Sequence, residues 1–290
     1  MKSLTASLLC ELPTELGEGA QLFPDGTFRF VDIPNGKVFR LDVQTPILEV
    51  KLKHEVSKSL PWHDGQLLLG RNFIHFFDQK GDEKTRLQVS AESSNLRCSD
   101  GCVLPDGSLL LGVVDRDMET GAGSLLHVST SLEITEVFSG ATIPNGVAVM
   151  PSGKDVVWVD SPTQTLVLLP IDQIGRIGKP QNYFVIEESF GVPDGLTVDS
   201  EGGIWVAMWG GSKLIRVSPS REIDIQVEVG TKNTTSCAFD SAKNLLITTA
   251  TAALSDEDRV GFGAGGVWIL EQARHGFEGL NPLVFGFRHN

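Results

Sequence analysis

The chain has 290 residues, of which 41% are hydrophobic and 21% charged, so it can bury a large core and does not belong to the disordered class. Its formal net charge is −13 and no basic stripe is visible, which argues against nucleic acid as a partner. No segment approaches the roughly 20 apolar residues that span a bilayer, so we expect no membrane partner either.

The first ten residues, MKSLTASLLC, faintly imitate an export signal. Their apolar part is short and interrupted by Ser and Thr, so we discount that interpretation. The cysteines show no paired spacing of the kind that zinc sites or disulfide frameworks use, and we expect free thiols. These are Cys10, Cys98, Cys102 and Cys237. The sequence therefore predicts a cytoplasmic protein.

Six turn tripeptides follow apolar segments along the chain. Gly supplies a positive φ in such turns, and Asp or Ser bonds the local backbone, so they suit β-hairpins. Their starts are 39, 42, 46, 49 and 41 residues apart. They are Pro24-Asp25-Gly26, His63-Asp64-Gly65, Pro105-Asp106-Gly107, Pro151-Ser152-Gly153, Ser200-Glu201-Gly202 and Ser241-Ala242-Lys243.

A short β-rich run follows each turn, and a further strand often comes after it. The first runs are TFRFVDI, QLLLGRN, SLLLGVVD, DVVWVDS, GIWVAMW and NLLITTA. Repeats of about 40 residues with four short strands each are the signature of a β-propeller. We predict an all-β fold, a six-bladed β-propeller with four antiparallel strands per blade, as one domain over residues 1–290. The N-terminal run SLTASLLCEL is a candidate outer strand for the sixth blade, which would remove an exposed edge.

The residue that stands six positions before each turn can be compared across the repeats. If the segment before each turn is the inner strand of a blade, these side chains lie at one level around the mouth of the central channel of the propeller. They are Glu18, Ser57, Ser99, Asn145, Asp194 and Thr235. Glu18, Asn145 and Asp194 carry hard oxygen donors, so we predict that they bind one divalent metal ion. Ca²⁺ is the first choice, with Mn²⁺, Zn²⁺ or Mg²⁺ as alternatives.

Several motifs together resemble the senescence marker protein/gluconolactonase/luciferin-regenerating enzyme family. They are LGEG at 16–19, VDI at 31–33, IPNG at 143–146, VPDGL at 192–196, WVAMWGG at 205–211 and TSCAF at 235–239. The resemblance covers most of the chain. It implies a six-bladed propeller that hydrolyses sugar lactones with one divalent metal ion in the channel. The family's three metal ligands fall on Glu18, Asn145 and Asp194.

The third-blade motif departs from that family. This chain reads Arg97-Cys98-Ser99-Asp100-Gly101, where the family usually has Arg-x-Asn-Asp-Gly. By resemblance, Arg97 contacts the substrate hydroxyls or the ring carbonyl, Ser99 replaces an Asn near metal and substrate, and Asp117 is a candidate acidic substrate contact. We interpret Trp158 and Trp209 as packing residues rather than sugar platforms.

Lactone hydrolysis needs a polarised carbonyl and an activated water, and a bound cation supplies both. Asp194 is the first candidate for accepting the proton of the water, and Asp100 is the second. Asp100 also has an alternative role, that of stabilising a turn before Gly101.

Two classes of function remain open. The first is a metal-dependent lactonase acting on an aldonolactone such as gluconolactone. The second is a propeller that hydrolyses another small ester or phosphoester, or a non-catalytic one that binds calcium or a sugar. The predicted partner is a small molecule, and the sequence does not determine the oligomeric state.

Overall fold

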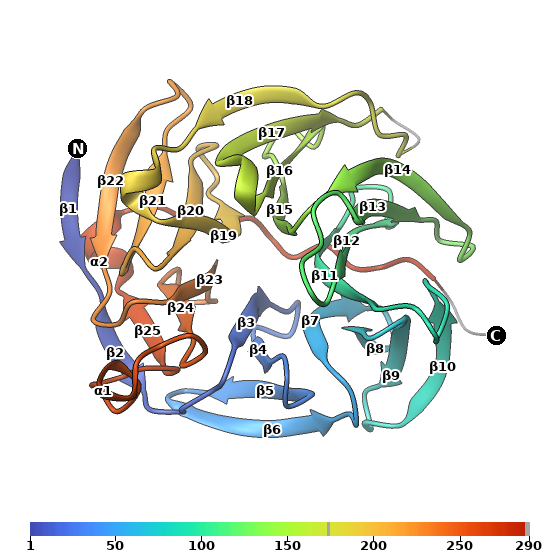
Figure 1. Ribbon diagram of the computed structural model, residues 1–290, viewed down its shortest axis with the longest axis horizontal. Helices are drawn as coiled ribbons and strands as arrows, with labels where there is room; N and C mark the ends of the chain where they lie inside the picture. Colours follow the sequence, from blue (N-terminus) through green and yellow to red (C-terminus); the bar gives the residue numbers. More distant parts are fainter. Residues whose placement is uncertain (173–174, 288–290) are drawn as a thin grey trace.

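The computed structural model describes residues 1–172 and 175–287, and in it six β-sheets stand around a central axis as the blades of a propeller (Figure 1). The predicted fold class is confirmed. In each blade the first strand lies nearest the axis and the following strands pair outward, antiparallel to one another. All six inner strands therefore begin at the same face of the ring.

The first three blades take their strands in chain order. Blade 1 consists of β3 (Gly17–Leu22), β4 (Phe28–Asp32), β5 (Lys37–Asp42) and β6 (Thr45–Lys51). Blade 2 consists of β7 (Val56–Trp62), β8 (Gly65–Gly70), β9 (Phe73–Asp78) and β10 (Glu83–Gln88). Blade 3 consists of β11 (Leu96–Val103), β12 (Leu109–Asp115), β13 (Gly123–Val128) and β14 (Ile134–Ala141).

The other three blades follow the same plan, and the last two also take strands from the N-terminus. Blade 4 consists of β15 (Pro144–Val149), β16 (Asp155–Asp160), β17 (Thr165–Pro170) and β18 (Gln181–Val185). Blade 5 consists of β19 (Val192–Val198), β20 (Ile204–Trp209), β21 (Lys213–Val217) and β22 (Ile223–Glu228). Blade 6 consists of β23 (Thr234–Phe239), β24 (Leu245–Thr249) and β25 (Val267–Leu270).

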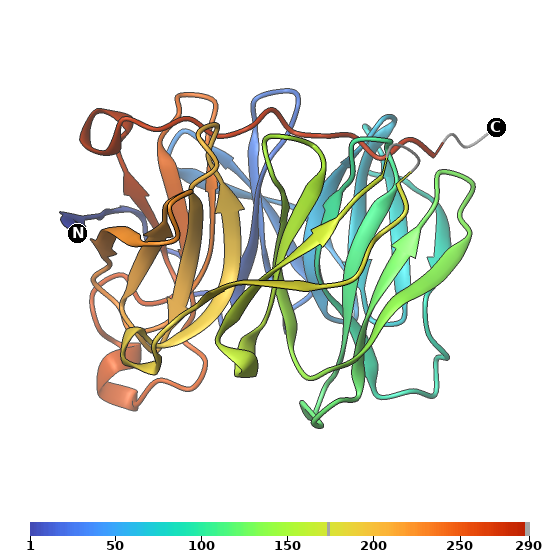
Figure 2. The ribbon, with the colours of Figure 1, turned by 90° about the horizontal axis from the view of Figure 1, so that it is seen from above.

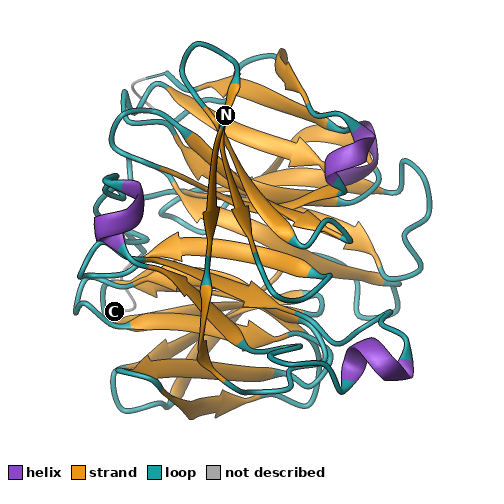
Figure 3. Ribbon diagram, turned by 90° about the vertical axis from the view of Figure 1, so that its left-hand side faces the viewer, coloured by secondary structure: helices purple, strands orange, loops and turns teal. Residues whose placement is uncertain are grey.

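The N-terminal run closes the ring, although not as one strand. β2 (Ser7–Cys10) pairs antiparallel with β25 and is the outer strand of blade 6, as predicted. β1 (Lys2–Thr5) instead pairs in parallel with β22 and adds a fifth strand to blade 5. The prediction that the whole run belongs to blade 6 is therefore wrong for its first half. Figure 3 shows the two strands along the outside of the ring, where they cover two sheet edges at once.

Among the described residues, helix occurs only in short segments (Figure 3): α1 (Asp256–Arg259), α2 (Gln272–His275), η1 (Ser161–Thr163) and η2 (Glu188–Phe190). Within the described ranges, no helix has the length and apolar character needed to cross a membrane. The four cysteines are free thiols, as expected.

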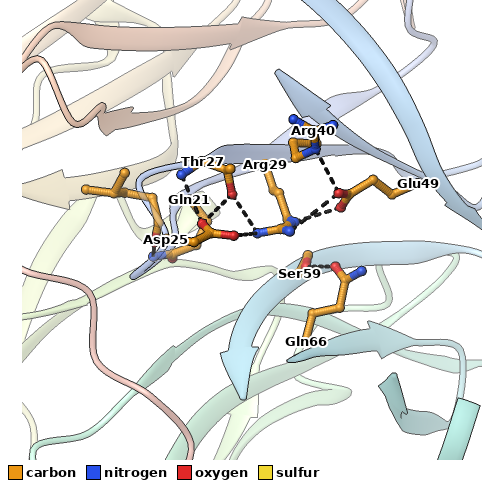
Figure 4. A network of polar contacts seen from close by, with 9 residues as sticks. Gln21, Asp25, Thr27, Arg29, Arg40, Glu49, Ser59 and Gln66 are labelled. Atoms are coloured by element: carbon orange, nitrogen blue, oxygen red, sulfur yellow. Dashed lines mark hydrogen bonds and ion pairs between the residues drawn. The ribbon is translucent and has the colours of Figure 1, made fainter. Parts of the chain in front are cut away.

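The core lies between neighbouring blades. Leu67, Leu68 and Leu69 of β8 are all fully buried, because blades cover both faces of the sheet. This explains why the second strand of most repeats reads as a nearly continuous apolar run, although β4 is interrupted by Arg29. On blade 1, Arg29 and Arg40 both contact the Glu49 carboxylate, at 2.7 and 3.0 Å, which ties three adjacent strands together (Figure 4).

The C-terminal segment after α2 crosses the face of the ring at which the inner strands end (Figures 1 and 2). The Phe285 amide donates to Pro61 O at 2.9 Å, and the Phe285 side chain is fully buried. Residues 279–283 and the ends of the inner strands enclose a cavity of about 120 Å³. The segment therefore covers one end of the channel, and the opposite mouth is where the predicted site residues lie.

Candidate functional site

The residues predicted from the register all lie in the first half of an inner strand. In each strand the pairing with its neighbour is irregular at or beside this position. A β-bulge re-aims a side chain and is common beside functional sites. Five of the six residues line the cavity at the channel mouth, whereas Thr235 is fully buried and donates to Gly17 O.

Glycine follows three of these residues, and the packing between inner strands explains it. A Cβ on Gly146 would lie 2.5 Å from Asp194 O, and one on Gly19 would lie 2.7 Å from Ser57 O. A Cβ on Gly195 would lie 2.8 Å from Thr235 O. Because no side chain fits at these distances, glycine is required at these three positions, where neighbouring inner strands approach closely.

A cavity of about 230 Å³ opens at this mouth. Its polar lining contains all but one of the predicted site residues: Glu18, Arg97, Ser99, Asp100, Asn145 and Asp194. These come from β3, β11, β15 and β19, which are far apart in the sequence and adjacent only around the axis. The structure therefore brings the predicted metal ligands and all of the predicted catalytic and substrate-binding residues except Asp117 into one pocket.

Glu18 and Asp194 are each 8% exposed and lie close together in the cavity. Burial and the negative charge of Asp194 raise the pKa of Glu18 well above its ordinary value. Burial also raises the pKa of Asp194 to about 7, although hydrogen bonds from Asn145 and Glu18 oppose this. Two carboxylates with this environment favour a bound cation, because ionising both leaves uncompensated buried charge.

Asn145 connects this pair to blade 4. Its Nδ2 donates to Asp194 Oδ1, and also to Ser161 Oγ at 3.2 Å. Among the described residues, no group of three or more His, Cys, Asp or Glu side chains is arranged to hold a metal ion. The candidate set is instead two carboxylates and one amide, a hard-oxygen set of the kind that Ca²⁺ and related cations accept.

Arg97 and Ser99 lie on the blade 3 side of the cavity. Arg97 Nη1 donates to Cys98 O at 2.9 Å, which holds the guanidinium in the lining. Burial lowers the pKa of Arg97, and the nearby carboxylates of Glu55 and Glu18 oppose this. Ser99 is 6% exposed, and its carbonyl accepts a hydrogen bond from Ser57 Oγ at 2.7 Å.

Asp117 is the one predicted site residue that the structure does not bring into the cavity lining. Its carboxylate accepts from Asn95 Nδ2 at 2.8 Å on the exposed side of the loop after β12. The next residue, Met118, lines the cavity instead. A contact between Asp117 and substrate stays a prediction without support from this arrangement.

The patterns in the sequence did not reveal every residue of the site. Trp158 is buried in the core, as expected, but Trp209 lines the cavity, so interpreting it as a packing residue was wrong. Lys58 forms a buried ion pair with Asp100. Comparing the next position of the repeat as well would have revealed this pair, since Lys58 and Asp100 both stand five residues before their turns.

The comparisons with known proteins identify the family and the fold. The model of the SMP-30/Gluconolactonase/LRE-like region matches residues 16–251. Regucalcin of Xenopus laevis is 28% identical over 275 residues, 90% of this chain and 91% of that protein. L-arabinolactonase of Azospirillum brasilense is 26% identical over 279 residues, 93% of this chain and 92% of that enzyme. The solved structure of a calcium-binding protein, regucalcin from Agrobacterium tumefaciens, has a TM-score of 0.91 at 26% identity and covers 98% of this chain and 99% of that one.

Proposed function

Because the chain belongs to the SMP-30/gluconolactonase/LRE-like family, we propose that it hydrolyses a sugar lactone to the free sugar acid with one divalent metal ion in the channel mouth. The observation that carries the proposal is the meeting of Glu18, Asn145 and Asp194 beside Arg97 in one buried cavity. Relatives named as lactonases support the reaction class, and one of them is named for arabinolactone.

A lactone is a cyclic ester. In hydrolysis the oxygen of a water molecule adds to the carbonyl carbon, and the carbonyl oxygen becomes an oxyanion. The bond from that carbon to the ring oxygen then breaks, and the ring oxygen takes a proton, which leaves a hydroxy acid. A bound divalent cation supplies Lewis acidity for the carbonyl and lowers the pKa of water.

The chain supplies the remaining groups. Glu18, Asn145 and Asp194 would hold the cation. Asp194 is the first candidate for accepting the proton of the attacking water, because its carboxylate lies in the cavity lining beside the position at which it would hold the cation. Arg97 stabilises the oxyanion, since a guanidinium donates several hydrogen bonds and keeps its charge. Ser99 binds a substrate hydroxyl near the carbonyl. Asp100 is the second candidate for the base.

We propose Ca²⁺ as the metal, with Mn²⁺, Zn²⁺ or Mg²⁺ as alternatives. Two carboxylates and an amide fit a hard cation that takes further ligands from water. A solved relative is described as calcium-binding, which supports the same choice. That description also favours a second candidate function, a propeller that binds calcium without catalysis.

The test begins with protein stripped of metal by a chelator. Isothermal titration with each of the four cations gives affinity and stoichiometry, and a pH-stat assay measures hydrolysis of glucono- and arabinonolactones above the uncatalysed rate. We expect one site, and turnover only in the loaded protein. Asp194→Ala should abolish metal binding and, with it, lactone hydrolysis.

Asp25→Ala is the matched control, because Asp25 is an exposed acid in the β3–β4 turn, outside the cavity lining. Full turnover after metal removal would refute metal dependence. Metal binding without hydrolysis of any lactone would favour the calcium-binding propeller.

A further inference from the structure

The cavity at the channel mouth has two chemically different parts. The carboxylates of Glu18, Asp100 and Asp194 are each 8% exposed and form its deep end. Met118 and Val192, which are 56% and 39% exposed, lie at its rim. The charged groups therefore lie at the deep end, where we place the reaction, and the outer wall of the cavity is apolar.

Apolar side chains make up this outer wall, which we call the rim. It consists of Leu16, Met118, Ile143, Val192 and Trp209. These residues come from four blades, since Leu16 precedes β3, Met118 follows β12, Ile143 precedes β15, and the last two lie on β19 and β20. An apolar wall assembled from so many segments is a property of the whole mouth and not of one loop.

The loop after β12 presents Met118 to the cavity because hydrogen bonds hold Asp117 elsewhere. The Met118 amide donates to Asp115 O at 2.9 Å, and Met118 has a φ of 57°. Asp115 Oδ1 accepts from the Asp117 amide at 2.9 Å, while the Asp117 carboxylate is bound by Asn95. This turn therefore places a thioether, and not a carboxylate, over the cavity.

The rim itself offers a substrate hydroxyl no polar partner except the indole N–H of Trp209. Elsewhere in the cavity, Ser57 Oγ donates to Leu69 O and Ser99 O, and Ser161 Oγ accepts from Asn145, so part of the hydrogen-bonding capacity of each is taken up. Arg97 and Ser99 lie beside the reacting end. Away from that N–H, a hydroxyl held against the rim would lose its hydrogen bonds to water without gaining others, whereas an alkyl group there removes apolar surface from water.

We propose that the substrate is a lactone whose carbon next to the ring oxygen carries an alkyl group, as in a deoxy sugar lactone or an alkyl lactone, rather than a fully hydroxylated one. With the carbonyl at Arg97, that substituent lies against the rim. This inference rests on the proposed lactonase function. Water adds to the carbonyl carbon, the ring C–O bond breaks, and the product is a hydroxy acid with the alkyl group on its hydroxyl-bearing carbon.

The test compares δ-lactones of one ring size: δ-valerolactone without a substituent, δ-decanolactone with a pentyl group, and glucono-δ-lactone. The metal-loaded protein is assayed by pH-stat, and each kcat/KM is divided by the uncatalysed rate constant of that lactone. We expect the normalised value for δ-decanolactone to exceed those for the other two by at least about tenfold, in line with the discrimination that apolar contacts provide.

Met118→Asn tests the rim directly. It should lower kcat/KM for δ-decanolactone, and with it the preference for δ-decanolactone over δ-valerolactone, by about fivefold or more, within the range for loss of an apolar contact. Val43→Asn is the matched control, because Val43 is also an exposed apolar residue with a φ of 57° and is absent from the cavity lining. It should change neither value.

A higher normalised value for glucono-δ-lactone than for δ-decanolactone would overturn this inference and leave the lactonase function standing. An unchanged preference in Met118→Asn would also overturn it. Hydrolysis of no lactone in the loaded protein would refute the lactonase function, and the inference with it.

Discussion

Lys58 Nζ lies 2.5 Å from Asp100 Oδ1, and both side chains are almost completely buried. The two residues stand at the same register on β7 and β11, the inner strands of neighbouring blades. Asp100 Oδ1 also accepts from the Gly101 amide at 2.7 Å. The third carboxylate of the cavity thus has its own counter-ion within the protein, which leaves Glu18 and Asp194 as the pair that needs a cation.

Removal of the Lys58 side-chain charge should therefore lower the stability of the folded protein. We expect Lys58→Met to lower the free energy of unfolding by about 3–5 kcal/mol, because Asp100 would remain as a buried charge without its partner. The measurement is chemical denaturation of the metal-free protein. Lys58→Met combined with Asp100→Leu should recover most of the loss, since both charges are then absent. A single variant that loses less than about 1 kcal/mol would mean that water reaches Asp100.

The metal-free protein should lose stability as the pH rises. The pKa of Asp194 is raised from 3.8 to about 7 in the native state, and that of Glu18 is raised as well. Between about pH 4 and 7 the native state thus binds more protons than the unfolded chain, so the free energy of unfolding falls as pH increases through this window.

Thermal unfolding of the metal-free protein from pH 5 to pH 8 measures this effect. We expect Tm to fall with rising pH, and the fall to be smaller in Asp194→Ala, which lacks the group. Cation affinity should rise in the same window by up to about tenfold per pH unit for each proton released. A Tm that increases steadily with pH in the wild type would show that other groups dominate.

Arg97→Ala should separate substrate binding from metal binding. A guanidinium cannot ligate a cation, so metal affinity should change little. Turnover efficiency on the best lactone should fall by about 10²-fold or more, as for removal of an oxyanion donor. Titration calorimetry and steady-state kinetics on the same preparation give both quantities. Equal losses in the two would indicate that Arg97 shapes the metal site.

Ser99→Asn tests the departure in the third-blade motif. The amide restores a group that the resemblance places near metal and substrate, so activity on gluconolactone should rise or stay the same. Kinetic constants and metal affinity are compared with those of the wild type. If the variant instead loses turnover on its best substrate, Ser99 is a specific adaptation and not a tolerated loss.

The sequence by itself determined the ring and its register. Turn residues and short apolar runs act locally, so their repetition was enough to count the blades and to align Glu18, Asn145 and Asp194. The glycines that follow these three residues have a local explanation too, since each lies where two inner strands approach closely. The turns and apolar runs depend on contacts that recur from repeat to repeat, and the glycines on a contact that recurs in three of the six.

Only the tertiary structure decided the contacts that do not repeat from blade to blade. The Lys58–Asp100 pair joins two blades, and the N-terminal run divides between two others because a free sheet edge was available on each. A hydrogen bond that Asn95 donates to the Asp117 carboxylate, and one that the Asp117 amide donates to Asp115, hold Asp117 away from the cavity, and Met118 lines it instead. Such choices depend on which partners surround one particular side chain in space, and a pattern read along the chain carries no information about them.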